Sequence, residues 1–203
     1  VLASLLSSRD MGRIPKVSPS EDVKWLRLSL RLLENAWKNH PRDPLIADMV
    51  FQIAHNYYTI SGKLVLREFF PDLFRQVVEF LVSTDINGLS SIGRIGAGRM
   101  ILFYVQNVKQ VREKEKYLEL VIRLCSIDED QRDLLWDFQY SESFAVSGLA
   151  YTERVKLKDN SLPRGQKREY LTKAIDCFDQ VLSVKTVYAP SDLNLRNQTK
   201  SYL

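Results

Sequence analysis

Apolar residues recur along the chain at spacings of three and four, which is the period of an α-helix. The first clear stripe contains Val23, Leu26, Leu30, Leu33 and Trp37. No stretch of the sequence keeps up the alternation of apolar and polar residues that a half-buried strand requires. The pattern therefore predicts an all-α protein without a sheet.

Capping residues, prolines and glycines divide the sequence into eight or nine predicted helices with short connections. Ser18-Pro19 and Asp43-Pro44 are typical helix starts, because a capping side chain precedes a Pro at the first helical position. Short connections favour antiparallel hairpins. The ranges expected are about 19–40, 44–61, 71–83, 90–109, 117–125, 126–138, 142–157, 165–182 and a short helix after 191, with a short apolar piece at 63–70.

Some of these helices carry apolar residues on more than one side. Trp25, Leu28 and Leu32 give the first helix a second apolar side, which predicts that it is buried between neighbouring helices. In the second helix we expect the stripe that begins at Leu45 to face inward.

The length of 203 residues indicates one domain, or two at most. We expect an N-terminal extension over 1–17 and a single helical domain over 18–203, with 18–109 and 110–203 as its sub-units. Because the chain begins with Val1 rather than Met, we expect a processed product or a piece of a longer chain.

Residues 142–185 resemble a tetratricopeptide repeat. Phe144, Gly148 and Tyr151 match the large, small and aromatic positions of its first helix, and Ala174 with Phe178 matches the small-then-aromatic pair of its second. The resemblance implies antiparallel hairpins stacked as a short superhelical array; HEAT-like pairs and an irregular helical bundle are the alternatives. It also implies that Gly148 and Ala174 lie where two helices touch, with Phe178 buried beside them.

The composition is that of an ordinary globular protein and excludes a disordered tail or a fibre. The chain is 45% hydrophobic and 27% charged, as ordinary globular proteins are, and its net charge of +4 permits an acidic partner without requiring one. Cys125 and Cys177 lie in helical patterns, so we expect buried, reduced thiols. No apolar run is long enough to span a membrane. We therefore expect an intracellular protein, cytoplasmic or nuclear, without membrane contact.

The run from Gly93 to Arg99 is the sharpest motif. It reads G-x-x-G-x-G with no strand before it, so it fits neither a dinucleotide fingerprint nor a phosphate-binding loop. We interpret it as a helix whose small residues let a neighbour pack closely. The alternative is an anion site, in which backbone N–H groups act together with Arg94 and Arg99.

The sequence offers no catalytic constellation, so we predict no catalytic residue, no cofactor and no metal. His40 and His55 are the only histidines, and neither has a recognisable nucleophile or orienting partner. The acidic cluster from Asp128 to Asp137 lacks the alternation and central Gly of a calcium loop. We interpret it as negative charge at a helix start.

Two basic blocks, near 94–116 and 154–173, are the candidate contacts with an anion or a partner. Their members are Arg94, Arg99, Lys109, Arg112, Lys114, Lys116, Lys156, Lys158, Lys167 and Arg168.

Helical arrays present long surfaces that bind peptides or helices of other proteins. We therefore predict a non-catalytic interaction scaffold, one subunit of a larger complex. The alternative is a helical nucleic-acid-binding protein that uses the basic blocks. We expect no such binding near physiological salt, because the acidic residues 128–142 separate the blocks in sequence and would repel phosphates if they also lay between them in space.

Overall fold

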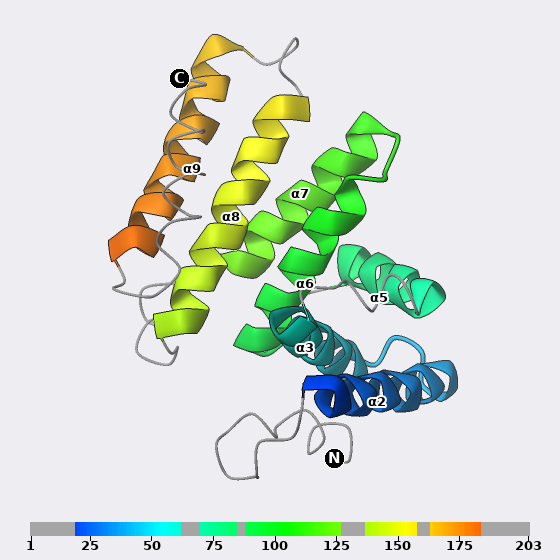
Figure 1. Cartoon of the computed structure of the whole chain (residues 1–203). Coiled ribbons are helices and arrows are strands. Elements are labelled where there is room, and N and C mark those ends of the chain that lie inside the picture. The colour runs from blue at the N-terminus through cyan, green and yellow to red at the C-terminus, as the bar shows by residue number, and fades with distance from the viewer. Residues whose placement is uncertain (1–18, 62–69, 85–87, 127–136, 158–162, 184–203) are drawn as a thin grey trace. The chain divides into compact units, whose positions relative to one another are not determined.

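The computed structural model describes residues 19–61, 70–84, 88–126, 137–157 and 163–183, with side chains described except at 19–23, 57–61 and 137–140 (Figure 1). This part of the chain folds into helices and contains no strand, which confirms the predicted all-α fold. The helices are α2 (Pro19–Asn39), α3 (Pro44–Ser61), α5 (Pro71–Ser83), α6 (Ser91–Val105), α7 (Val111–Cys125), α8 (Asp137–Leu157) and α9 (Arg164–Ser183).

Three predicted helix boundaries were wrong. The helix expected to begin near residue 117 begins at Val111 instead. The helix expected to reach residue 109 ends at Val105, where the chain turns tightly and the Asn107 N–H donates to the carbonyl of Tyr104 at 3.0 Å. The break expected between residues 138 and 142 does not exist, since α8 runs on without interruption from Asp137.

Several predicted features lie outside the described residues. These are the extension over 1–17, the cap at Ser18, most of the apolar piece at 63–70, most of the helix expected at 126–138 with its acidic cluster, Lys158, and the short helix after 191.

Contacts divide the chain into two compact units, Val1–Met100 and Ile101–Leu203. The division falls inside α6, earlier than the division after residue 109 that the sequence suggested.

In the first unit, α2 and α3 form an antiparallel hairpin (Figure 1). The Asp43 carboxylate caps α3 as predicted, since it accepts the backbone N–H of Leu45 at 2.8 Å. At the end of α2, the indole N–H of Trp37 donates to the Gln76 side chain at 3.0 Å, and its ring meets Phe80 edge-on at 5.6 Å. These contacts join α2 to α5.

The predicted inward faces of this unit were only partly right. The stripe through Leu26, Leu30, Leu33 and Trp37 is buried, and so is Phe51, which the sequence pattern did not single out. The second apolar side of α2 is exposed, and so is Leu45. The burial of that second side was predicted from hydrophobicity alone, but in the described part of the unit the packing partners of α2 lie on the side of Leu30 and Trp37.

In the second unit, α7, α8 and α9 lie side by side in chain order, and α8 packs against both neighbours (Figure 1). A Cβ built on Gly148 of α8 would lie 2.8 Å from the Phe178 ring of α9. Ala174 and Phe178 are fully buried. The predicted close contact between these two helices is therefore confirmed, whereas the repeat family remains a prediction.

Candidate interaction surfaces

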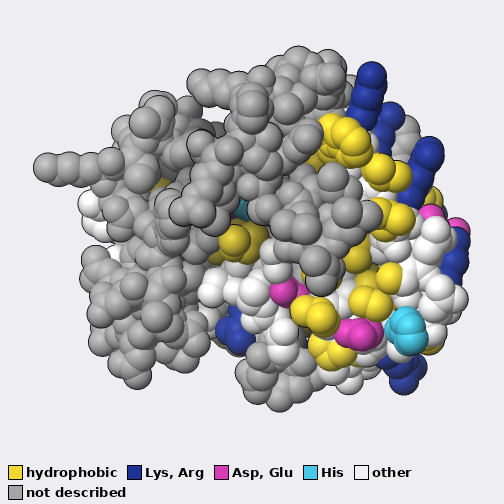
Figure 2. All heavy atoms as spheres, turned by 90° about the horizontal axis from the view of Figure 1, so that it is seen from below, with side chains coloured by type: hydrophobic (Ala, Val, Ile, Leu, Met, Phe, Trp, Pro, Cys, Tyr) yellow, Lys and Arg dark blue, Asp and Glu magenta, His cyan; other side chains and the backbone are white. Residues whose placement is uncertain are grey.

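The outer face of α2 carries an exposed apolar row. Trp25, Leu28 and Leu32 are 37%, 41% and 38% exposed and follow one another at spacings of three and four, which places them on one face of the helix. Figure 2 shows hydrophobic side chains exposed in a band on the side of the molecule that includes α2. Exposed leucines in a row are unusual for a helix that already buries its opposite face.

A row of cations borders this apolar row. Lys24, Arg31 and Lys38 are exposed and lie seven residues apart, so they stand on one side of α2. Lys38 also pairs at 3.3 Å with the half-buried Glu34, one helical turn away. Figure 2 shows Lys and Arg side chains at the edge of the hydrophobic band. We call the two rows together the α2 face.

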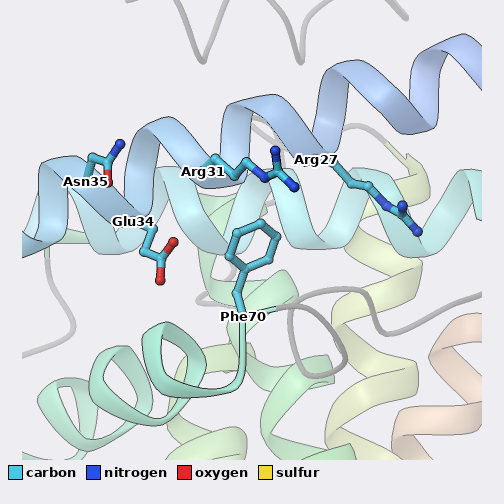
Figure 3. Close-up of a pocket in the computed structure, with 5 residues that line it drawn as sticks. All are labelled: Arg27, Arg31, Glu34, Asn35 and Phe70. Carbon is cyan, nitrogen blue, oxygen red and sulfur yellow. The ribbon is translucent and has the colours of Figure 1, made fainter.

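A pocket of about 430 Å³ opens on the basic side of this face. Arg27, Arg31, Glu34 and Asn35 of α2 line it together with Phe70, the residue before α5 (Figure 3). In Figure 3 the Arg31 side chain lies above the Phe70 ring, and the Glu34 carboxylate projects from α2 on the same side as that ring. Small-molecule sites of this size are usually lined by apolar side chains. The charged lining instead extends the α2 face toward α5.

The Gly93–Arg99 run lies in α6 and begins at a capped helix start. The Ser90 hydroxyl accepts the Gly93 N–H at 3.1 Å, while the buried Asp48 carboxylate of α3 accepts both the N–H and the hydroxyl of Ser90 at 2.9 Å. Gln52 donates to the same carboxylate at 2.7 Å. The helix start that could attract an external anion therefore already has a carboxylate from α3 beside it.

The glycines of this run let α6 approach α3 closely. A Cβ on Gly93 would collide with the Asp48 carboxylate, and one on Gly96 would lie 2.5 Å from the Phe51 carbonyl oxygen and 3.0 Å from His55. These contacts support the interpretation of the run as a packing surface. Of its two cations, Arg94 donates to the Leu89 carbonyl at 3.2 Å, and Arg99 is half-buried.

The second unit brings most of the other predicted cations to one end. The start of α7, the end of α8 and the start of α9 lie at this end (Figure 1). We call it the basic end. Lys109, Arg112, Lys116, Lys156 and Arg168 are exposed there, whereas Lys114 and Lys167 are half-buried. Lys156 pairs with Glu153 at 2.6 Å.

Arg154 of α8 joins the three helices of this end. Its guanidinium lies 3.5 Å from Glu115 and 3.7 Å from Glu119 of α7. The same group lies 4.8 Å from the ring centre of Tyr170 in α9, within the range of a cation–π contact. The sequence did not single out Arg154, because its partners are distant along the chain and only the packing of α8 between α7 and α9 unites them.

The helices that flank the acidic segment meet at the opposite end of this unit. The Cys125 carbonyl at the end of α7 accepts the hydroxyls of Ser143 at 2.8 Å and Ser147 at 3.3 Å. Most of the acidic stretch lies outside the described residues, so its predicted position between the basic blocks stays a prediction.

Both cysteines are free. Cys125 is buried as predicted, whereas Cys177 is only half-buried, so its predicted burial was not fully right. Burial, assisted by the nearby charge of Asp176, raises the pKa of the Cys177 thiol to about 12. Such a thiol stays protonated near neutral pH and is a poor nucleophile. Burial likewise raises the pKa of Tyr151.

Within the described ranges, no group of three His, Cys, Asp or Glu side chains is placed to hold a metal ion. None of the described helices is both long and apolar enough to cross a membrane. No protein-family model, curated protein or solved structure matches this chain.

Proposed function

We propose that this protein is a non-catalytic scaffold that binds an amphipathic, acidic segment of a partner protein along the α2 face. The proposal places it in the cytoplasm or nucleus, within a larger complex. The observation that carries it is the exposure of Leu28 and Leu32 beside a row of cations.

The apolar row supports binding of a protein segment. Protein interfaces are built around apolar side chains that lose water on binding, surrounded by a polar rim. Leu28 and Leu32 of α2, with Trp25 on the same face, form such an apolar centre. The pocket beside Phe70 adds a concave region at its border. A helical partner would present anchors at the matching spacing of three, four and seven residues.

The cation row supports the acidic character of that segment. Lys24, Arg31 and Lys38 run parallel to the apolar row over two intervals of seven residues. A partner helix that laid its apolar side on Leu28 and Leu32 would bring one of its flanks against these cations. Acidic residues on that flank would be favoured, and basic residues would be repelled.

The test is a titration with a labelled synthetic peptide that carries leucines at helical spacing and glutamates along one flank. We expect binding by fluorescence anisotropy, with an affinity reduced about tenfold or more by Leu28→Ser with Leu32→Ser, because this change removes about 1–2 kcal/mol of apolar burial. The matched control is Leu45→Ser with Val82→Ser, which removes two other exposed apolar side chains of the same unit and should leave binding intact.

A charge swap tests the second half of the proposal. Reversal of Lys24, Arg31 and Lys38 to Glu should weaken binding of the acidic peptide and create binding of a peptide whose glutamates are replaced by lysine. The proposal fails if neither peptide binds the native protein, or if the control variant loses as much affinity as the Leu28→Ser, Leu32→Ser variant.

A further inference from the structure

Among the described residues, the basic end of the second unit holds more positive charge than its own carboxylates neutralise. Arg154 and Lys156 are engaged by glutamates of α7 and α8. Six further cations of this end make no ion pair with any described residue: Lys109, Arg112, Lys114, Lys116, Arg164 and Arg168. All except Lys114 are exposed.

These cations extend across three adjacent helices. Arg112 and Lys116 lie on α7, Arg164 and Arg168 lie on α9, and α8 stands between them. Helices pack about 8–10 Å apart, so the cations span roughly 20 Å. That width corresponds to about six phosphates along one strand of a duplex, at a rise of 3.4 Å per nucleotide.

The basic end exposes much less apolar surface than the α2 face does. Exposed apolar surface favours docking of a protein over binding of phosphates. Among the described residues of the second unit, Val111 is the single large apolar side chain that is exposed. A protein partner or a membrane would find little apolar surface to bury there. Phosphate contacts need cations on a solvated surface, and these are what the three helix ends present.

We propose that the basic end is a second binding site, which holds the phosphate backbone of a nucleic acid without reading its sequence. Arg112 and Lys116 contact phosphates at one side, and Arg164 and Arg168 contact them at the other. Arg154 acts as a positioning residue, since its contacts with Glu115 and Tyr170 hold α7 and α9 to α8. The proposal rests on the second unit alone and is independent of the α2 face.

The experiment titrates the whole chain with a fluorescein-labelled 20-base-pair DNA duplex at several salt concentrations. Four phosphate contacts predict a log–log slope of roughly −3 to −4, at about −0.9 per contact, which amounts to about a hundredfold loss of affinity between 50 and 200 mM salt. Reversal of Arg112, Lys116, Arg164 and Arg168 to Glu should abolish binding at 50 mM salt. The helical circular dichroism and urea midpoint should stay unchanged, since all four side chains are exposed.

A matched control variant reverses Lys24, Arg31, Lys38 and Arg123 to Glu. These are exposed cations elsewhere on the chain, and their reversal changes the net charge by the same amount. The control variant should bind the duplex as the native chain does. Equal loss in both variants would overturn the proposal, because net charge and no particular surface would then explain binding.

Two further probes separate the classes of partner. Polyglutamate stands for an acidic protein, and vesicles that contain phosphatidylserine stand for an anionic membrane. Both should bind far more weakly than the duplex at equal salt. The proposal is overturned if either probe matches the duplex on the control variant, whose reversed α2 cations no longer attract acidic chains, or if the native chain does not bind the duplex at 50 mM salt.

Discussion

The Phe178 ring of α9 packs directly on Gly148 of α8, so that a Cβ on the glycine would lie 2.8 Å from a ring carbon. An ordinary side chain at Gly148 would push the ring away, and the ring has nowhere to move because it is fully buried. The pair thus sets the distance between α8 and α9. It also bears on the basic end, because the same two helices contribute Arg154 and Tyr170.

Replacement of Phe178 by Ala should destabilise the protein by about 3–5 kcal/mol, because it leaves a cavity beside a glycine that cannot fill it. Urea unfolding followed by circular dichroism measures the effect. The comparison is Val82→Ala, an exposed position at which a change within about 0.5 kcal/mol is expected. An unchanged midpoint for the Phe178 variant would mean that its ring is not part of the core.

Replacement of Gly96 by Ala should destabilise the protein by about 1–3 kcal/mol, even though Ala is the better helix former. The added Cβ would meet the Phe51 carbonyl oxygen at 2.5 Å, and backbone cannot yield as a flexible side chain can. Gly165→Ala is the control, since nothing lies within 4 Å of a Cβ there. If both variants unfold at the native urea midpoint, α3 and α6 do not pack as described.

Alkylation of Cys177 should be slow in the native protein and strongly dependent on pH. The thiolate is the reactive form, and burial raises the pKa of this thiol from 9.0 to about 12. Below pH 9 the native rate should therefore be about a thousandfold lower than in urea, since each pKa unit changes the thiolate fraction about tenfold. Iodoacetamide labelling located by mass spectrometry gives both rates. Native labelling as fast as unfolded labelling at pH 8 would contradict the assigned burial.

Local signals in the sequence predicted much of the fold. The helix start at Asp43 is encoded by its own neighbours, and the stripe from Leu26 to Trp37 needs no knowledge of its partner. The prediction that Gly148 and Ala174 lie where two helices touch, with Phe178 buried beside them, came from small and aromatic residues at the positions of a tetratricopeptide repeat. In each case the pattern along the chain contains the physical cause.

The rest depends on contacts that sequence does not reveal. The apolar row with Leu28 and Leu32 has the same hydrophobicity as a core stripe, and only the position of neighbouring helices shows it to be exposed. The burial of Ser143 also shows only in the structure, where its hydroxyl donates to the Cys125 carbonyl of α7. The basic end likewise needed the antiparallel pairing of α7 with α8, which sets Arg154 beside Glu115.

The central claim is that the α2 face binds partner segments that carry an apolar stripe with acidic residues along one flank. A displayed library of random 16-residue peptides tests this claim most directly. The native protein serves as bait, and the Leu28→Ser, Leu32→Ser variant removes peptides that bind elsewhere. We expect the surviving peptides to carry apolar residues at spacings of three and four with Asp or Glu on one side, and to lose affinity when Lys24, Arg31 and Lys38 are reversed to Glu. Survivors rich in Lys and Arg, or a selection in which no peptide distinguishes the native protein from the variant, would contradict it.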